Sequence, residues 1–167
     1  SDEATLIAVD APLGLPRGMD CLEQTCDCRS AWPHKGRKAD REIIARGISI
    51  YVITKQTFIK EMIDRAIGLK TALEQRGHRV IEVYPHASKV SLFGSRPPKK
   101  TTSAGRRFMH ERLRKLVGGL DGQTVTLTHD HYDAIVAAYT GLLHSAGKTE
   151  TLGLADEGAI VLPARAM

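Results

Sequence analysis

Short apolar runs rich in β-branched residues alternate with longer segments of helical periodicity. Residues 5–9 (TLIAV) and 79–84 (RVIEVY) form two such runs, and each gives way to a proline-containing segment. Prolines stop strands, so both runs predict short strands that end where the prolines begin. Further extended segments are predicted at 48–53 and 158–163.

Apolar side chains recur at helical spacing in four segments, which are 37–46, 54–76, 105–117 and 129–146. Glycines directly after the first two segments are typical of helix ends. Residues 18–36 and 88–105 are predicted to be irregular, the second as a mobile basic loop, and 120–128 to be a polar connection with a short strand. Helices that alternate with buried strands indicate an α/β domain with a partly parallel sheet.

The length of 167 residues favours one domain, 1–167, in which the cysteine-containing segment 17–53 is an insertion. No apolar run is long enough to span a bilayer, and the acidic start does not resemble a signal peptide, so we expect a cytoplasmic protein. The usual glycine-rich phosphate-binding motifs and the G-x-S-x-G motif are absent.

Three acidic residues occupy positions where ligands often bind. Asp10 follows the first buried strand, at the sheet edge where open α/β proteins place their ligands. Asp130 and Asp133 are three residues apart and share a helix face. They could bind a divalent cation through carboxylate oxygens, or Asp130 could cap the helix with Asp133 as a first-turn acid.

Two further groups of residues carry candidate chemistry. Lys and Arg are concentrated in 29–46 and 89–115, which fits either a nucleic-acid surface or a solvated basic face in a chain of net charge +5. Cys21, Cys26 and Cys28 could bind zinc with His34 as a fourth ligand, or be free structural thiols.

Four motifs together resemble a known family. They are IAVDAPLGLP (7–16), VIEVYPHA (80–87), HYDAIVAA (131–138) and DEGAIVLP (156–163). The chain resembles a family of unknown function, DUF family 429, predicted to be an RNase H-like nuclease. More distantly it is similar to RuvC-type resolvases. The resemblance implies an α/β RNase H-like fold, a mixed sheet flanked by helices. The chain opens at what corresponds to the fourth strand, so we expect the first strands to be missing and a homodimer to cover the exposed sheet edge.

The resemblance also implies a metal-dependent nuclease that hydrolyses phosphodiester bonds in DNA or RNA. Asp10, Asp130 and Asp133 would bind Mg²⁺ or Mn²⁺, with Glu82 as a further catalytic candidate. The substrate would bind to five basic residues, which are Lys89, Lys99, Lys100, Arg106 and Arg107. Two cations about 4 Å apart can activate a water and stabilise the leaving oxygen. A proton could pass through His86, His129 or His131, although each also suits a surface or capping role.

Two alternatives remain open. The chain could be a catalytically inert member that binds nucleic acid or a protein. Independently, a structural zinc site could stabilise the cysteine-rich segment.

Overall fold

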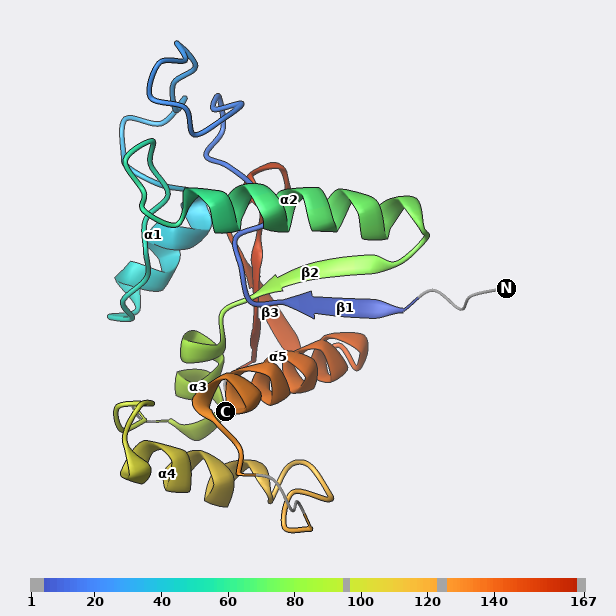
Figure 1. The fold of residues 1–167 in the computed structure, drawn as a ribbon. Helices are drawn as coiled ribbons and strands as arrows, with labels where there is room; N and C mark the ends of the chain where they lie inside the picture. The colour runs from blue at the N-terminus through green and yellow to red at the C-terminus, as the bar shows by residue number, and fades with distance from the viewer. Residues whose placement is uncertain (1–4, 95–96, 123–125, 165–167) are drawn as a thin grey trace.

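A four-stranded mixed sheet forms the centre of the computed structural model, which describes residues 5–94, 97–122 and 126–164 (Figure 1). The strands are β1 (Leu6–Val9), β2 (Arg79–Val83), β3 (Thr149–Leu152) and β4 (Ile160–Pro163). Their spatial order is β1-β2-β4-β3. Strands β1, β2 and β4 are parallel, and β3 is antiparallel to β4. The expectation of an α/β protein with a partly parallel sheet is therefore confirmed.

Five α-helices surround the sheet. They are α1 (Lys38–Ala45), α2 (Lys60–Gln75), α3 (Pro85–Phe93), α4 (Ser103–Leu113) and α5 (His129–Ser145), and a 3₁₀ helix covers Ala155–Glu157. Helices α2 and α5 lie on opposite sides of β1 and β2 (Figure 1). Ala137 of α5 packs against Val83 and Val161, so α5 is fixed on the sheet by a small apolar core.

The structure corrects the sequence-based interpretation at four places. The predicted mobile loop 88–105 begins inside helix α3, whose buried face includes Ala87 and Ser88. The segment 48–53 forms no strand, and β3 was not predicted. Of the polar connection 120–128, residues 123–125 lie outside the described residues, and the remainder contains no strand.

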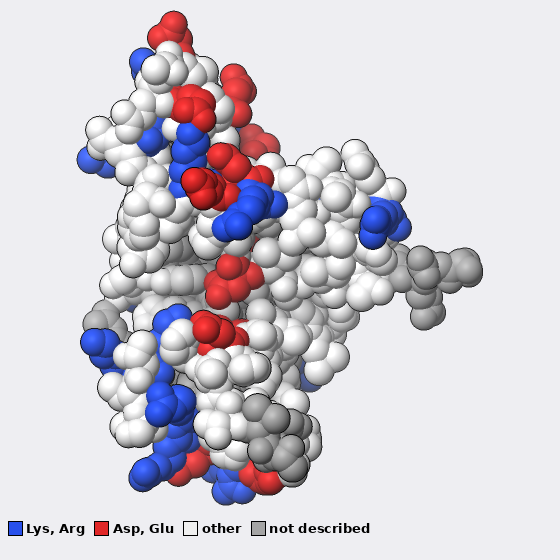
Figure 2. All heavy atoms as spheres, viewed as in Figure 1, with Lys and Arg blue, Asp and Glu red and all other residues white. Residues whose placement is uncertain are grey.

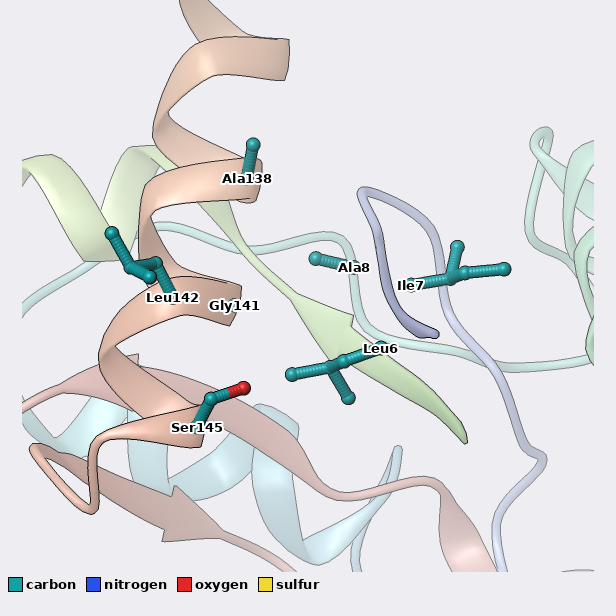
Figure 3. Close-up of a pocket in the computed structure, with 7 residues that line it drawn as sticks. All are labelled: Leu6, Ile7, Ala8, Ala138, Gly141, Leu142 and Ser145. Atoms are coloured by element: carbon teal, nitrogen blue, oxygen red, sulfur yellow. The ribbon is translucent and has the colours of Figure 1, made fainter. Parts of the chain in front are cut away.

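Strand β1 forms one edge of the sheet, and within the described ranges no strand pairs with its outer side. Residues of β1 and of the second half of α5 line an apolar groove of about 400 Å³ beside this edge. Figure 3 shows Leu6 and Ala8 pointing toward α5 and Ile7 pointing away, as strand alternation requires. The edge that a homodimer would cover is therefore β1. The groove lining contains none of the predicted site acids.

The loop after β1 is held against the 3₁₀ helix at Gly14. A Cβ atom added there would lie 2.5 Å from the carbonyl carbon and oxygen of Glu157. We therefore expect Gly14→Ala to lower the free energy of unfolding by about 1–3 kcal/mol, as overpacking does. Gly68→Ala in α2 is the control, since its Cβ meets nothing within 4 Å and should stabilise the helix by about 0.5–1 kcal/mol. Urea denaturation measures both. A Gly14→Ala protein as stable as wild type would contradict the packing argument.

Within the part of the chain that the structure describes, none of the helices has the length and apolar character needed to cross a membrane.

Candidate functional site

Asp10 lies directly after β1, at the edge of the sheet where the parallel strands end. Helix α5 packs against β1, and its first turns carry Asp130 and Asp133. Figure 2 has the same view as Figure 1. It shows acidic side chains in the middle of this face, in the region where β1 ends and α5 begins. The fold thus brings together acids that are more than a hundred residues apart in the sequence.

Asp133 is buried and is held by two lysines. Lys89 of α3, itself buried, donates to Oδ1 of Asp133. Lys100 donates to Oδ2 at 3.0 Å, and its own side chain is 54% exposed. Both carboxylate oxygens therefore accept from an ammonium group, one enclosed and one able to move into solvent.

The pKa of Asp10 is raised to about 6. Burial is the largest cause and the charge of Asp133 the next, while Lys100 and Lys89 act in the opposite direction. By its solvent accessibility Asp10 is nevertheless an exposed residue. A carboxyl group with this pKa is mostly ionised at neutral pH and becomes protonated in mild acid.

His129 completes a cluster of possible cation ligands. One ligand atom from each of His129, Asp130 and Asp133 lies within 4.8 Å of the others. Nδ1 of His129 is buried and lies 2.8 Å from Oδ1 of Asp130. It makes no hydrogen bond to any described residue, because the geometry of that contact is not aligned for one. A buried nitrogen without a hydrogen bond beside two carboxylates fits a cation-binding group. Asp10 is not in this group of three, and its link to them is the effect of the charges of Asp133 and Asp130 on its pKa. We call Asp10, His129, Asp130 and Asp133 the acid cluster.

The alternative in which Asp130 caps α5 is wrong. Thr128 is the N-cap residue, and its backbone N–H donates to Nδ1 of His131 at 3.0 Å. Asp130 lies in the first turn and is exposed, where the helix dipole favours its charge. His131 therefore has a capping role, and the carboxylate of Asp130 is not needed to begin the helix.

The predicted substrate-binding residues divide into two groups. Lys89 is buried against Asp133. Lys99 and Arg107 are exposed and Arg106 half-buried, close to the start of α4, where Arg106 donates to the carbonyl of Thr101 at 3.3 Å. Figure 2 shows basic side chains gathered over the α4 region, on the same face as the central acids. We call Lys99, Lys100, Arg106 and Arg107 the basic strip.

Glu82, the further catalytic candidate that the resemblance implied, is buried and only 4% exposed. Its two carboxylate oxygens accept from Nη1 and Nη2 of Arg37, each at 2.7 Å, and Oε2 also accepts from the backbone of Leu13 at 2.7 Å. Burial raises the pKa of Glu82, and Arg37 opposes that rise. The contacts of Glu82 are those of a structural ion pair.

The three cysteines lie together, while the predicted fourth zinc ligand does not join them. The Sγ atoms of Cys21, Cys26 and Cys28 are within 4.8 Å of one another, and His34 is exposed and outside this group. The pKa of Cys28 is lowered to about 6, chiefly through backbone hydrogen bonds at Asp20 and Cys21. We call the three thiols the Cys cluster.

Comparisons with known proteins identify a family. No curated protein matches the chain, and no solved structure matches it either. One family model matches residues 1–157, which include the acid cluster, the basic strip and the Cys cluster. The chain therefore belongs to the family described as "Protein of unknown function (DUF429)".

Proposed function

We propose that the protein is a divalent-metal-dependent nuclease of RNase H-like fold that hydrolyses phosphodiester bonds of DNA or RNA. The observation that carries the proposal is the convergence of His129, Asp130 and Asp133, whose ligand atoms lie within 4.8 Å of one another, at the start of the helix that packs against the strand ending before Asp10. Carboxylates from different elements are the ligands that Mg²⁺ and Mn²⁺ prefer.

The chemistry of the donor set fits such a cation. Asp10, Asp130 and Asp133 would bind Mg²⁺ or Mn²⁺, and Nδ1 of His129 lies beside them, 2.8 Å from Oδ1 of Asp130. A bound cation supplies a Lewis acid and lowers the pKa of a coordinated water. Lys89 donates to Oδ1 of Asp133 and so fixes the orientation of that carboxylate. Lys100 is half-exposed and can exchange its contact with Asp133 for a substrate phosphate.

The basic strip suits the substrate in this proposal. Lys100 contacts Asp133, and Lys99, Arg106 and Arg107 lie near it in the chain, around the start of α4. Their charges are complementary to a phosphodiester backbone. Contacts of these side chains with phosphates would make the affinity for nucleic acid depend strongly on salt.

A second candidate function is a catalytically inert nucleic-acid-binding protein of the same family. The specific observation in its favour is that Lys89 and Lys100 already neutralise both oxygens of Asp133. In that case the acids serve to hold the lysines, and no cation is needed.

The affinity for Mn²⁺ distinguishes the two functions through its pH dependence. In the nuclease, Asp10 must lose a proton before it binds a cation. We therefore expect the affinity of the protein for Mn²⁺ to rise by up to about tenfold per pH unit below pH 6 and to level off above pH 6. Electron paramagnetic resonance of free Mn²⁺ measures this between pH 5 and 8. Asp10→Asn should bind Mn²⁺ more weakly and lose the pH dependence in that range.

Asp64→Asn, an exposed acid on α2, is the matched control and should behave as wild type. Cleavage is then measured on duplex DNA, branched DNA, single-stranded DNA and RNA with Mg²⁺, Mn²⁺ or a chelator. Nucleic-acid binding with equal Mn²⁺ affinity in wild type and Asp10→Asn, and no cleavage of any substrate, would reject the nuclease and support the inert protein.

A further inference from the structure

Three thiols converge in the irregular segment between β1 and α1. Sγ of Cys21 lies 3.9 Å from Sγ of Cys28, and Sγ of Cys26 is within 4.8 Å of both. All three cysteines are free and half-buried. Figure 1 shows this segment as the blue and cyan loops beyond α1 and α2.

The spacing of the sulfurs suits a shared metal ion better than a disulfide. A disulfide requires about 2.0 Å between the sulfurs. A tetrahedral zinc ion with Zn–S bonds of about 2.3 Å keeps its sulfur ligands about 3.8 Å apart. The separation of 3.9 Å between Cys21 and Cys28 therefore corresponds to one edge of a zinc–thiolate tetrahedron.

We propose that Cys21, Cys26 and Cys28 bind one zinc ion as three thiolate ligands. The groups around Cys26 and Cys28 favour negative charge there. The backbone N–H of Cys28 donates to Sγ of Cys26 at 3.5 Å, and two cationic side chains bind the backbone carbonyls of these two cysteines. Arg29 donates to the carbonyls of Cys26 and Cys28 at 2.6 and 2.9 Å, and Lys55 also donates to Cys26. Three thiolates and Zn²⁺ carry a net charge of −1, which these cations offset.

The zinc ion would have an open fourth position. His34 does not reach the Cys cluster, and among the described residues no carboxylate or imidazole joins the three sulfurs. A water molecule or an added ligand therefore completes the coordination, since the cysteines are accessible to solvent.

Zinc would also fasten this loop onto the domain. Leu22, between the ligands, is fully buried against Ile53 and Ile63. The segment has no regular secondary structure between residues 10 and 37. Zinc–thiolate bonds would therefore stabilise it in place of the backbone hydrogen bonds of a strand or helix.

Metal content and cobalt substitution of the full chain test the proposal. We expect about one zinc per chain after reconstitution with Zn²⁺ and a reductant, and a thiolate-to-metal charge-transfer band with Co²⁺. Cys26→Ser should weaken zinc binding at least about 100-fold, because loss of a ligand exceeds the 10–100-fold loss that supporting residues cause. His34→Ala is the matched control and should bind zinc as wild type does.

Thiol reactivity of the wild type keeps the test independent of whether Cys26→Ser folds. With zinc bound, a chromogenic disulfide reagent should modify the three thiols at least about 10-fold more slowly than after chelation. Substoichiometric zinc, a cobalt spectrum without the charge-transfer band, or equal thiol reactivity in both states would overturn the proposal. Mn²⁺ binding at the acid cluster is measured on the same samples and should not depend on zinc, so the two metal proposals fail separately.

Discussion

Arg37→Met is expected to lower the free energy of unfolding by about 3–5 kcal/mol, the typical cost of removing one partner of a buried ion pair. Arg37 is fully buried and donates to both oxygens of Glu82 at 2.7 Å. It also donates to Oδ1 of Asp40, from Nη2 at 2.9 Å, and to the carbonyl of Gly158 at 3.1 Å. The substitution would leave two carboxylates enclosed without a counter-charge. Urea denaturation at neutral pH measures the loss.

The large loss of stability expected for Arg37→Met depends on the burial of its ion pairs, and a substitution in an exposed ion pair serves as the matched control. Arg114→Met removes an arginine whose ion pair with Asp121 has a distance of 3.6 Å and side chains that are 48% and 67% exposed. Exposed pairs contribute little, so we expect a change below about 1 kcal/mol. A loss from Arg37→Met no greater than that from Arg114→Met would contradict the structural role of the ion pairs of Arg37. Glu82 would then be free for the catalytic role that its sequence position allowed.

The elements that the sequence predicted well are those whose local pattern and tertiary environment agree. The apolar runs before Asp10 and Pro85 form β1 and β2, and the periodic segments at 54–76 and 129–146 contain α2 and α5. Their ends differ by several residues in α2, which begins only at Lys60. Apolar side chains at helical spacing were enough to identify the two helices, although in α2 only Ile63 and Ala66 are buried and Leu69 is exposed.

The missed elements have buried polar or weakly apolar residues. The sequence pattern indicates only that a strand ends at Pro85. Proline also suits the first turn of a helix, and in the structure Pro85 is the first residue of α3. Ser88 and Lys89 suggested a solvated loop, yet both are buried against α5, where Ser88 accepts from Thr140. Strand β3 has the sequence TETL and exists through its pairing with β4, which no local pattern could show.

The candidate site was predictable in its acids but not in its partners. Asp10 and the pair Asp130 and Asp133 were identified by their positions at a strand end and a helix start. The contacts of Asp133 with Lys89 and Lys100 span 44 and 33 residues, and those of Glu82 with Arg37 span 45. Such distances along the chain are set by topology, so the sequence alone could not separate a solvated acid from one held by a buried cation.

Asp133→Asn is expected to reduce metal-dependent cleavage by about 100-fold or more if the acid cluster binds the catalytic cation. The substitution removes a charged oxygen from the cluster while keeping the size of the side chain. Loss of a ligand should cost at least as much as the 10–100-fold effects known for supporting residues of metal sites. Cleavage rates and Mn²⁺ affinity are measured on protein whose circular dichroism matches wild type, because Lys89 would then be buried beside an uncharged amide.

Lys100→Gln separates cation binding from a purely structural ion pair, because only the nuclease predicts a change in Mn²⁺ affinity. Lys100 donates to Asp133 at 3.0 Å and is half-exposed, so it competes with a cation for the same carboxylate. Removing its charge should tighten Mn²⁺ binding by a few fold in the nuclease, following the Coulomb repulsion between like charges near the surface. The Michaelis constant for nucleic acid should rise at the same time, since one phosphate contact is lost. In an inert protein, Lys100→Gln would weaken nucleic-acid binding and leave Mn²⁺ affinity as low as in Asp133→Asn. In the nuclease, Lys100→Gln should therefore bind Mn²⁺ more tightly than wild type, and Asp133→Asn should lose Mn²⁺ binding. Together these two results would identify the carboxylate of Asp133 as a cation ligand, which Lys100 contacts when no cation is bound.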